Sequence, residues 1–194
     1  MEDAIYKAPA AELDPEIEKG NANNFYVVGL WKVTFLYLLT LGIYSIYWFY
    51  RNWKIQKQRY NLEAIPVLRG IFQIFFTHSL CSAVDDQIQD RKIEYTWHPQ
   101  TIATLYVIAL IADSIFDRML GEQATDFLIS YIPLLVSVIP MLLMQRAINI
   151  AEGDPKGQSN SSLTPFNILW ALPGILLYGL LTLAIYAAST GTEF

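Results

Sequence analysis

Two aspartates interrupt an otherwise apolar stretch in the middle of the chain. Asp113 and Asp117 fall within Thr101–Leu120, which has no other charge except Arg118. Because they are four residues apart, a helix presents both carboxylates on one face. A carboxylate inside a membrane span is costly and typically marks a proton or cation path. The alternative is a helix that ends early, with Asp113 already at the level of the lipid headgroups.

A second set of residues has the side chains of a metal site. His78, Cys81 and Asp85 are spaced i, i+3 and i+7, so one face of a helix could present all three. No fourth ligand accompanies them, and Cys81 is the only cysteine, which excludes a disulfide and a cysteine-rich zinc site. The alternative is a helix with a small buried thiol and polar neighbours. We therefore predict no metal and no other cofactor.

Three polar residues near residue 150 predict a structural contact. Gln145, Asn149 and Glu152 share one helix face at the end of an apolar segment. Amide side chains at such a position bridge neighbouring helices by hydrogen bonds. We predict a polar seam that contacts adjacent helices or the basic cluster described next, rather than a ligand site.

A basic cluster follows the longest aromatic run of the chain. It contains Arg51, Lys54, Lys57 and Arg59, with Trp53 among them. Near a membrane surface each such cation adds about 1 kcal/mol of attraction to anionic lipid. We predict that these five residues bind anionic headgroups. The alternative is that the charges act only as a topology signal, and the two roles are compatible.

The elements that would position these residues are predicted to be membrane-spanning helices. Val33–Tyr50 is uncharged and, at 1.5 Å per residue, is roughly 27 Å long as a helix, close to one hydrocarbon thickness. The chain is 54% hydrophobic and only 16% charged, which favours a membrane protein. We predict an all-α integral membrane protein with one domain, residues 25–190, and about four spans, at 33–50, 101–120, 127–146 and 163–188.

Two further segments complete the prediction. Residues 1–24 are polar and acidic, and we predict a disordered tail. In residues 65–84, Arg69, Gln73 and Thr77 recur every four residues and form a polar stripe. This pattern predicts an amphipathic helix that lies in the membrane interface. The alternative is a fifth span or a re-entrant element.

The charges suggest an orientation. With four spans and both termini outside, nine of the thirteen Lys and Arg residues lie on the cytoplasmic side, as the positive-inside rule requires. Alternatively, Gly42 breaks the first span into a shorter helix and an interfacial one, which leaves the tail cytoplasmic. The net charge of −5 argues against a nucleic-acid partner.

Several sequence blocks together resemble a known pattern. They are TLGIYSIYWFYRNWKIQK, FFTHSL followed by an acidic pair, and QRAIN followed by GDPKGQSN. In this order they resemble an uncharacterised family of small polytopic bacterial inner-membrane proteins. The resemblance implies a multi-pass helical protein of the bacterial inner membrane. It supplies no activity and no catalytic residues.

The functional predictions follow from these features. No Ser-His-Asp arrangement, phosphate loop, HExxH or dinucleotide fingerprint is present, so we predict that the protein is not an enzyme. The leading hypothesis is a membrane scaffold or accessory subunit that binds anionic lipid and a partner protein. The alternative is a small transporter or channel that uses Asp113 and Asp117, as a homo-oligomer because four helices enclose little space. A third hypothesis is a metal-dependent membrane enzyme.

Overall fold

The fold is all-helical, as predicted. The computed structural model describes residues 23–119 and 124–190, so most of the predicted tail lies outside the described residues. Within those ranges the structure has no strand. It contains a three-residue 3₁₀ helix, η1 (Gln158–Asn160), and seven α-helices: α2 (Leu30–Leu39), α3 (Tyr44–Tyr60), α4 (Pro66–Ile71), α5 (Gln73–Asp90), α6 (Pro99–Met119), α7 (Ala124–Ala151) and α8 (Pro165–Thr190).

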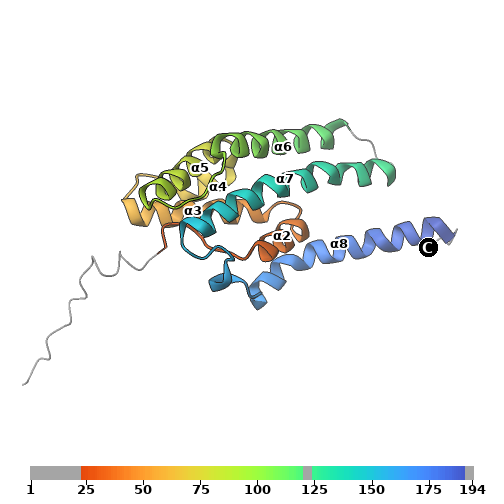
Figure 1. The fold of residues 1–194 in the computed structure, drawn as a ribbon. Coiled ribbons are helices and arrows are strands. Elements are labelled where there is room, and N and C mark those ends of the chain that lie inside the picture. Colours follow the sequence, from red (N-terminus) through yellow and green to blue (C-terminus); the bar gives the residue numbers. More distant parts are fainter. Residues whose placement is uncertain (1–22, 120–123, 191–194) are drawn as a thin grey trace, which may run out of the picture.

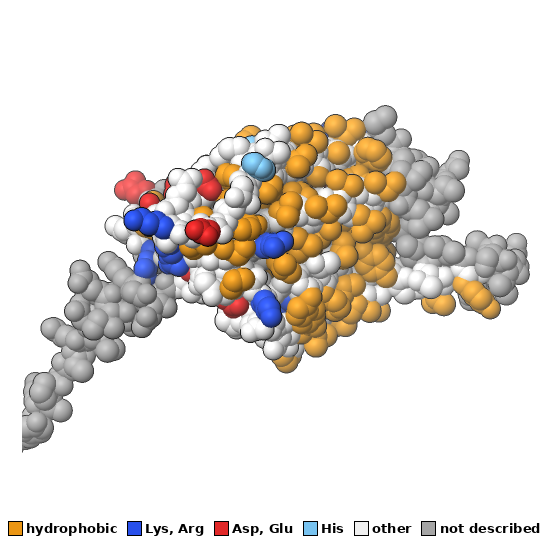
Figure 2. Space-filling model, viewed as in Figure 1, with side chains coloured by type: hydrophobic (Ala, Val, Ile, Leu, Met, Phe, Trp, Pro, Cys, Tyr) orange, Lys and Arg blue, Asp and Glu red, His pale blue; other side chains and the backbone are white. Residues whose placement is uncertain are grey.

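The helices divide the molecule into two halves of different character. An antiparallel hairpin of α6 and α7 runs the length of the molecule, and α8 extends in the same direction beneath it (Figure 1). Most charged side chains gather where α3 and α5 end, and hydrophobic side chains cover much of the described surface on the opposite side (Figure 2). We call these the polar end and the apolar half. Residue 23 lies at the polar end, and α8 ends on the opposite side.

Two helices are long and apolar enough to cross a membrane. They are α6, over Pro99–Phe116, and α7, over Tyr131–Ala151. The helices α2 and α8 are also apolar, but the qualifying stretches, Leu30–Leu39 and Pro165–Leu180, are shorter. The helices predicted at 101–120, 127–146 and 163–188 are therefore present, but four spans are not confirmed.

The first predicted span is wrong as a continuous helix. The chain forms α2, reverses direction over residues 40–43 and continues as α3. At 1.5 Å per residue, the ten residues of α2 rise about 15 Å, half of a hydrocarbon core. The chain thus starts at the polar end, turns within the apolar half, and returns along α3 (Figure 1). The break lies at Gly42, as the alternative interpretation of the sequence allowed.

Local chemistry explains the break at residues 40–43. Leu41 and Gly42 both have positive φ, 51° and 83°, a conformation that glycine adopts without steric cost. The amide of Gly42 donates to the Tyr37 carbonyl at 2.8 Å. The hydroxyl of Thr40 accepts the backbone N–H of Tyr44 at 2.9 Å, which caps the start of α3. These groups end one helix and begin the next.

The predicted interfacial helix is present in two pieces, and its polar stripe faces inward. Helices α4 and α5 meet at Phe72. Thr77 is fully buried, and Gln73 bonds to Ser45 and Tyr106 at 2.9 and 3.0 Å. The stripe therefore packs against the protein, because its groups find partners there, and the placement of this helix in the membrane interface stays a prediction. The outer face is apolar and exposed at Ile71, Phe72 and Phe75.

Helix α8 approaches α2 closely at one glycine. A Cβ atom on Gly174 would overlap the backbone carbonyl of Leu39. One turn later, the Tyr178 hydroxyl donates to the Leu38 carbonyl at 3.1 Å. By contrast, a Cβ on Gly179 meets nothing within 4 Å. The absence of a side chain at position 174 therefore sets the position of α8.

We predict that Gly174→Ala lowers the thermal unfolding midpoint in detergent, because the backbone of α2 must shift away from the new methyl group. Overpacking of this kind costs about 1–3 kcal/mol. Gly179→Ala is the matched control in the same helix and should not lower the midpoint, since alanine is the better helix former and meets no neighbour there. Equal midpoints for the two variants would contradict the close approach of α2 and α8.

Candidate functional site

The seam predicted on α7 holds an extended stretch of backbone. Gln145 donates to the Tyr26 carbonyl at 3.1 Å, and Asn149 donates to the Val28 carbonyl at 2.8 Å. Asn149 also accepts the Val28 amide at 3.3 Å. Gln145 in turn accepts the indole N–H of Trp48, which is fully buried in α3. These contacts connect α7 to α3 and to the segment that precedes α2.

Helix α3 binds the same extended segment from its other side. Asn52 accepts the Tyr26 amide at 3.0 Å, and Gln56 donates to the Asn24 carbonyl at 2.8 Å. Glu152 accepts the Asn24 amide at 3.1 Å. The bound residues 24, 26 and 28 alternate, as an extended chain requires. We call these five side chains, four amides and one carboxylate, the amide ladder: Asn52, Gln56, Gln145, Asn149 and Glu152.

Sequence reasoning identified only the α7 half of the amide ladder. Asn52 and Gln56 lie between the cations of the basic cluster in the sequence, and their spacing of four residues places both amides on one helix face. Two amides on one face of an aromatic helix were the available signal.

The structure places Asp113 beside hydroxyl groups. Asp113 is half-buried and interacts electrostatically with the phenol of Tyr37 in α2. The Tyr37 hydroxyl lies 2.7 Å from the Ser137 hydroxyl of α7. The side chain of Asp117 is outside the described part of the chain. The transport path through Asp113 and Asp117 stays a prediction.

The candidate metal ligands point to different partners. His78 bonds to Thr104 at 3.0 Å, and Asp85 accepts the indole N–H of Trp97 at 2.8 Å. Burial raises the pKa of the Cys81 thiol to about 12, which disfavours the thiolate that a metal needs. Across the described residues, no three His, Cys, Asp or Glu side chains are grouped to hold a metal ion. The structure therefore does not assemble this site.

Two cations of the basic cluster stack on tyrosines. The Arg51 guanidinium carbon lies 5.0 Å from the Tyr26 ring centroid, and the Lys54 ammonium lies 5.8 Å from that of Tyr50. The Nε atom of Arg51 is buried and has no hydrogen-bond partner. Within the described residues, neither side chain forms an ion pair or a hydrogen bond. Both positive charges are therefore available to an anion.

The other members of the predicted lipid site differ in their environments. Lys57 donates to the Ala64 carbonyl at 2.8 Å, and Arg59 has a buried nitrogen without a partner. Trp53 is only 4% exposed and lies 4.0 Å below the guanidinium of Arg69. Its ring is covered by the protein itself and offers little surface to a headgroup, so lipid binding by Trp53 stays an untested prediction.

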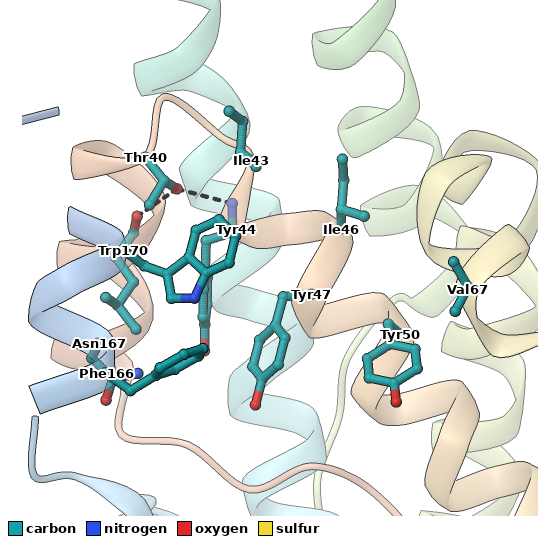
Figure 3. A pocket seen from close by; sticks show the side chains of 11 residues that line it. Thr40, Ile43, Tyr44, Ile46, Tyr47, Tyr50, Val67, Phe166, Asn167 and Trp170 are labelled. Atoms are coloured by element: carbon teal, nitrogen blue, oxygen red, sulfur yellow. Dashed lines mark hydrogen bonds between the residues drawn. The ribbon is translucent and has the colours of Figure 1, made fainter. Parts of the chain in front are cut away.

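An open groove of about 370 Å³ lies between α3 and α8. Tyr44, Tyr47 and Tyr50 of α3 form one wall, and Phe166 and Trp170 of α8 form the other (Figure 3). The two α8 rings pack edge to face with their centroids 6.1 Å apart. Sequence reasoning noted the aromatic run before the basic cluster but missed the groove, because α8 is distant in sequence.

The mouth of the groove is polar. The hydroxyls of Tyr44, Tyr47 and Tyr50 point the same way (Figure 3). Arg51 interacts electrostatically with the phenols of Tyr44 and Tyr47. Tyr44 is 7% exposed, its buried hydroxyl has no partner within hydrogen-bond distance and angle, and the Tyr26 phenol interacts with it electrostatically. The groove is therefore apolar, one of its lining residues carries a buried hydroxyl, and Arg51 stacks on Tyr26 beside the Tyr47 ring.

These features define a helical protein with one charged end, an apolar half, and two helices able to cross a membrane. The chain matches no protein-family model, and neither curated proteins nor solved structures gave a match. The resemblance to small bacterial inner-membrane proteins therefore stays a prediction.

We predict that Gln145→Met destabilises the protein by about 1–3 kcal/mol, because the buried Trp48 indole and the Tyr26 carbonyl lose their partner. The thermal unfolding midpoint in detergent, followed by tryptophan fluorescence, measures this. Arg146→Gln, at the exposed neighbouring position, is the control and should have no effect. If Gln145→Met unfolds at the wild-type temperature, the amide ladder is not an important source of stability.

Proposed function

We propose that the protein is a multi-pass protein of the bacterial inner membrane with three crossings, α6, α7 and α8, and one re-entrant pair, α2 and α3. Helix α8 supports this arrangement because its 26 residues carry no charge and extend alongside the α6–α7 hairpin (Figure 1). The re-entrant pair is favoured because α2 is half the required length and α3 returns to the polar end.

The charges support an orientation with the polar end in the cytoplasm. Of the Lys and Arg residues in the described ranges, this arrangement leaves only Arg118 on the outer side. The segment before residue 23 then joins the domain on the cytoplasmic side. This is the alternative that a broken first span allowed, with the C-terminal end of α8 outside.

We predict that a cysteine at position 23 is shielded from a membrane-impermeant maleimide in intact bacterial spheroplasts and reacts after lysis. Asn23 is exposed, whereas the native Cys81 is buried and gives little background. Gln58→Cys is the cytoplasmic control, and Arg118→Cys should react in intact spheroplasts. Reaction of Asn23→Cys in intact spheroplasts would favour the four-span arrangement instead.

We further propose that the protein acts without catalysis, as a membrane scaffold or accessory subunit that binds anionic lipid and a partner protein. One observation carries the lipid part: Arg51 and Lys54 have no anionic partner in the described protein. The exposed apolar face of α4 and α5 would lie in the membrane close to these cations. The acidic segment before residue 23 is the candidate to bind a protein partner, since it joins the domain at this end.

We predict that the triple variant Arg51→Gln, Lys54→Gln and Lys57→Gln loses its enrichment of anionic lipid. Each removed cation weakens the attraction by about 1 kcal/mol. The measurement is the ratio of phosphatidylglycerol to phosphatidylcholine retained in polymer nanodiscs cut from mixed vesicles. Lys92→Gln with Lys156→Gln removes exposed cations elsewhere at the polar end and is the control. An unchanged ratio in the triple variant would refute the lipid role.

A further inference from the structure

We propose that the groove between α3 and α8 is a binding site for one anionic phospholipid. One acyl chain lies in the groove, and the phosphate contacts Arg51 and the hydroxyls of Tyr44 and Tyr47. This inference rests on the proposed lipid binding and deepens it, because it replaces general surface attraction with one defined site.

The body of the groove fits a hydrocarbon chain. Its walls are aromatic rings and the aliphatic side chains of Ile43, Ile46 and Val67. Ile43 and Trp170 are more than half exposed, at 60% and 57%, so the groove is open along its length. Covering apolar surface of this kind with apolar groups rather than water is favourable by a free energy of about 25 cal/mol per Å². An acyl chain entering from the bilayer covers it without any movement of the helices.

The mouth of the groove fits a phosphate. A buried hydroxyl without a partner is unfavourable, and Tyr44 carries one at this point. The buried Nε of Arg51 is a second donor without an acceptor, and the same cation faces the phenols of Tyr44 and Tyr47. A phosphate supplies several acceptor oxygens and a negative charge, so it suits both kinds of donor once the side chains that cover them turn aside.

An amphipathic anion fits the groove better than a helix of a partner protein. The hydroxyls of Tyr44 and Tyr47 point the same way, Arg51 lies beside Tyr47 on the ring of Tyr26, and the remaining walls of the groove are mostly apolar. A transmembrane helix would fill the apolar body but bring no anion to the mouth. A phospholipid supplies both parts in the order that the groove presents them.

The test uses the full-length protein reconstituted with phosphatidylglycerol that carries a photoreactive diazirine in one acyl chain. Cross-linked peptides and the number of lipids retained are read by mass spectrometry. We expect one strongly retained lipid per chain, cross-linked to the α3 and α8 peptides that contain Ile43 and Trp170. Labelled phosphatidylcholine should be retained roughly tenfold less, because it lacks net negative charge.

Two variants separate the body of the site from its mouth. Ile43→Trp places a large ring in the groove and should abolish the cross-link, whereas Leu176→Trp, at an exposed α8 position outside the groove, should not. Tyr44→Phe removes only the unpaired hydroxyl. It should lower lipid retention roughly tenfold, the value of one hydrogen bond to a charged group, without lowering the unfolding temperature in detergent.

The possible outcomes distinguish this site from general lipid binding. If Ile43→Trp and Tyr44→Phe retain lipid normally while the triple charge variant does not, the groove site is overturned and the proposed surface binding stands. If none of these variants changes retention, both proposals fail. Cross-links spread evenly over α6 and α7 indicate bulk lipid only, and exclusion of lipid by a protein bound in the groove also overturns the site.

Discussion

The structure depends on satisfying the backbone of one extended segment in a place that water does not reach. Between residues 24 and 28 the chain makes neither helix nor sheet, so its peptide groups need other partners. The amide ladder supplies them from α3 on one side and α7 on the other. Because the same side chains join these two helices, they fix the position of residues 24–28 relative to α3 and to the α6–α7 hairpin.

The turn at residues 40–43 has the next largest consequence. The chain contains two closely similar hexapeptides, LTLGIY at Leu39–Tyr44 and LTLAIY at Leu181–Tyr186. The second continues as helix within α8, whereas the first reverses the chain at Gly42. Glycine adopts positive φ without the steric cost that alanine pays. This one difference gives a short α2, a returning α3, and space beside α8 for the groove.

Polar groups within the apolar half mostly bond to one another. Gln73, Tyr106, Tyr37 and Ser137 all have partners inside the protein, while apolar side chains face outward. Tyr44, Arg51, Trp53 and Arg59 differ, because a buried donor on each has no partner. Of these, Tyr44 lines the open groove and Arg51 stacks on Tyr26 beside it, and unpaired donors at an open groove point to a ligand rather than to packing. That contrast is the reason to favour a lipid at this place over the Asp113 region, whose groups already have partners.

Composition and apolar length by themselves determined an all-helical chain, the helices α6, α7 and α8, and the polar seam at Gln145 and Asn149, because these follow from local pattern. Sequence also showed that Gly42 could break the first span, but not that it does. Only the tertiary structure decided that Trp53 is buried, that the stripe of α5 faces inward, and that Tyr44 meets Trp170 across a groove. Each of these depends on which helix packs against which face, and contacts between different helices leave no periodic signal in the sequence.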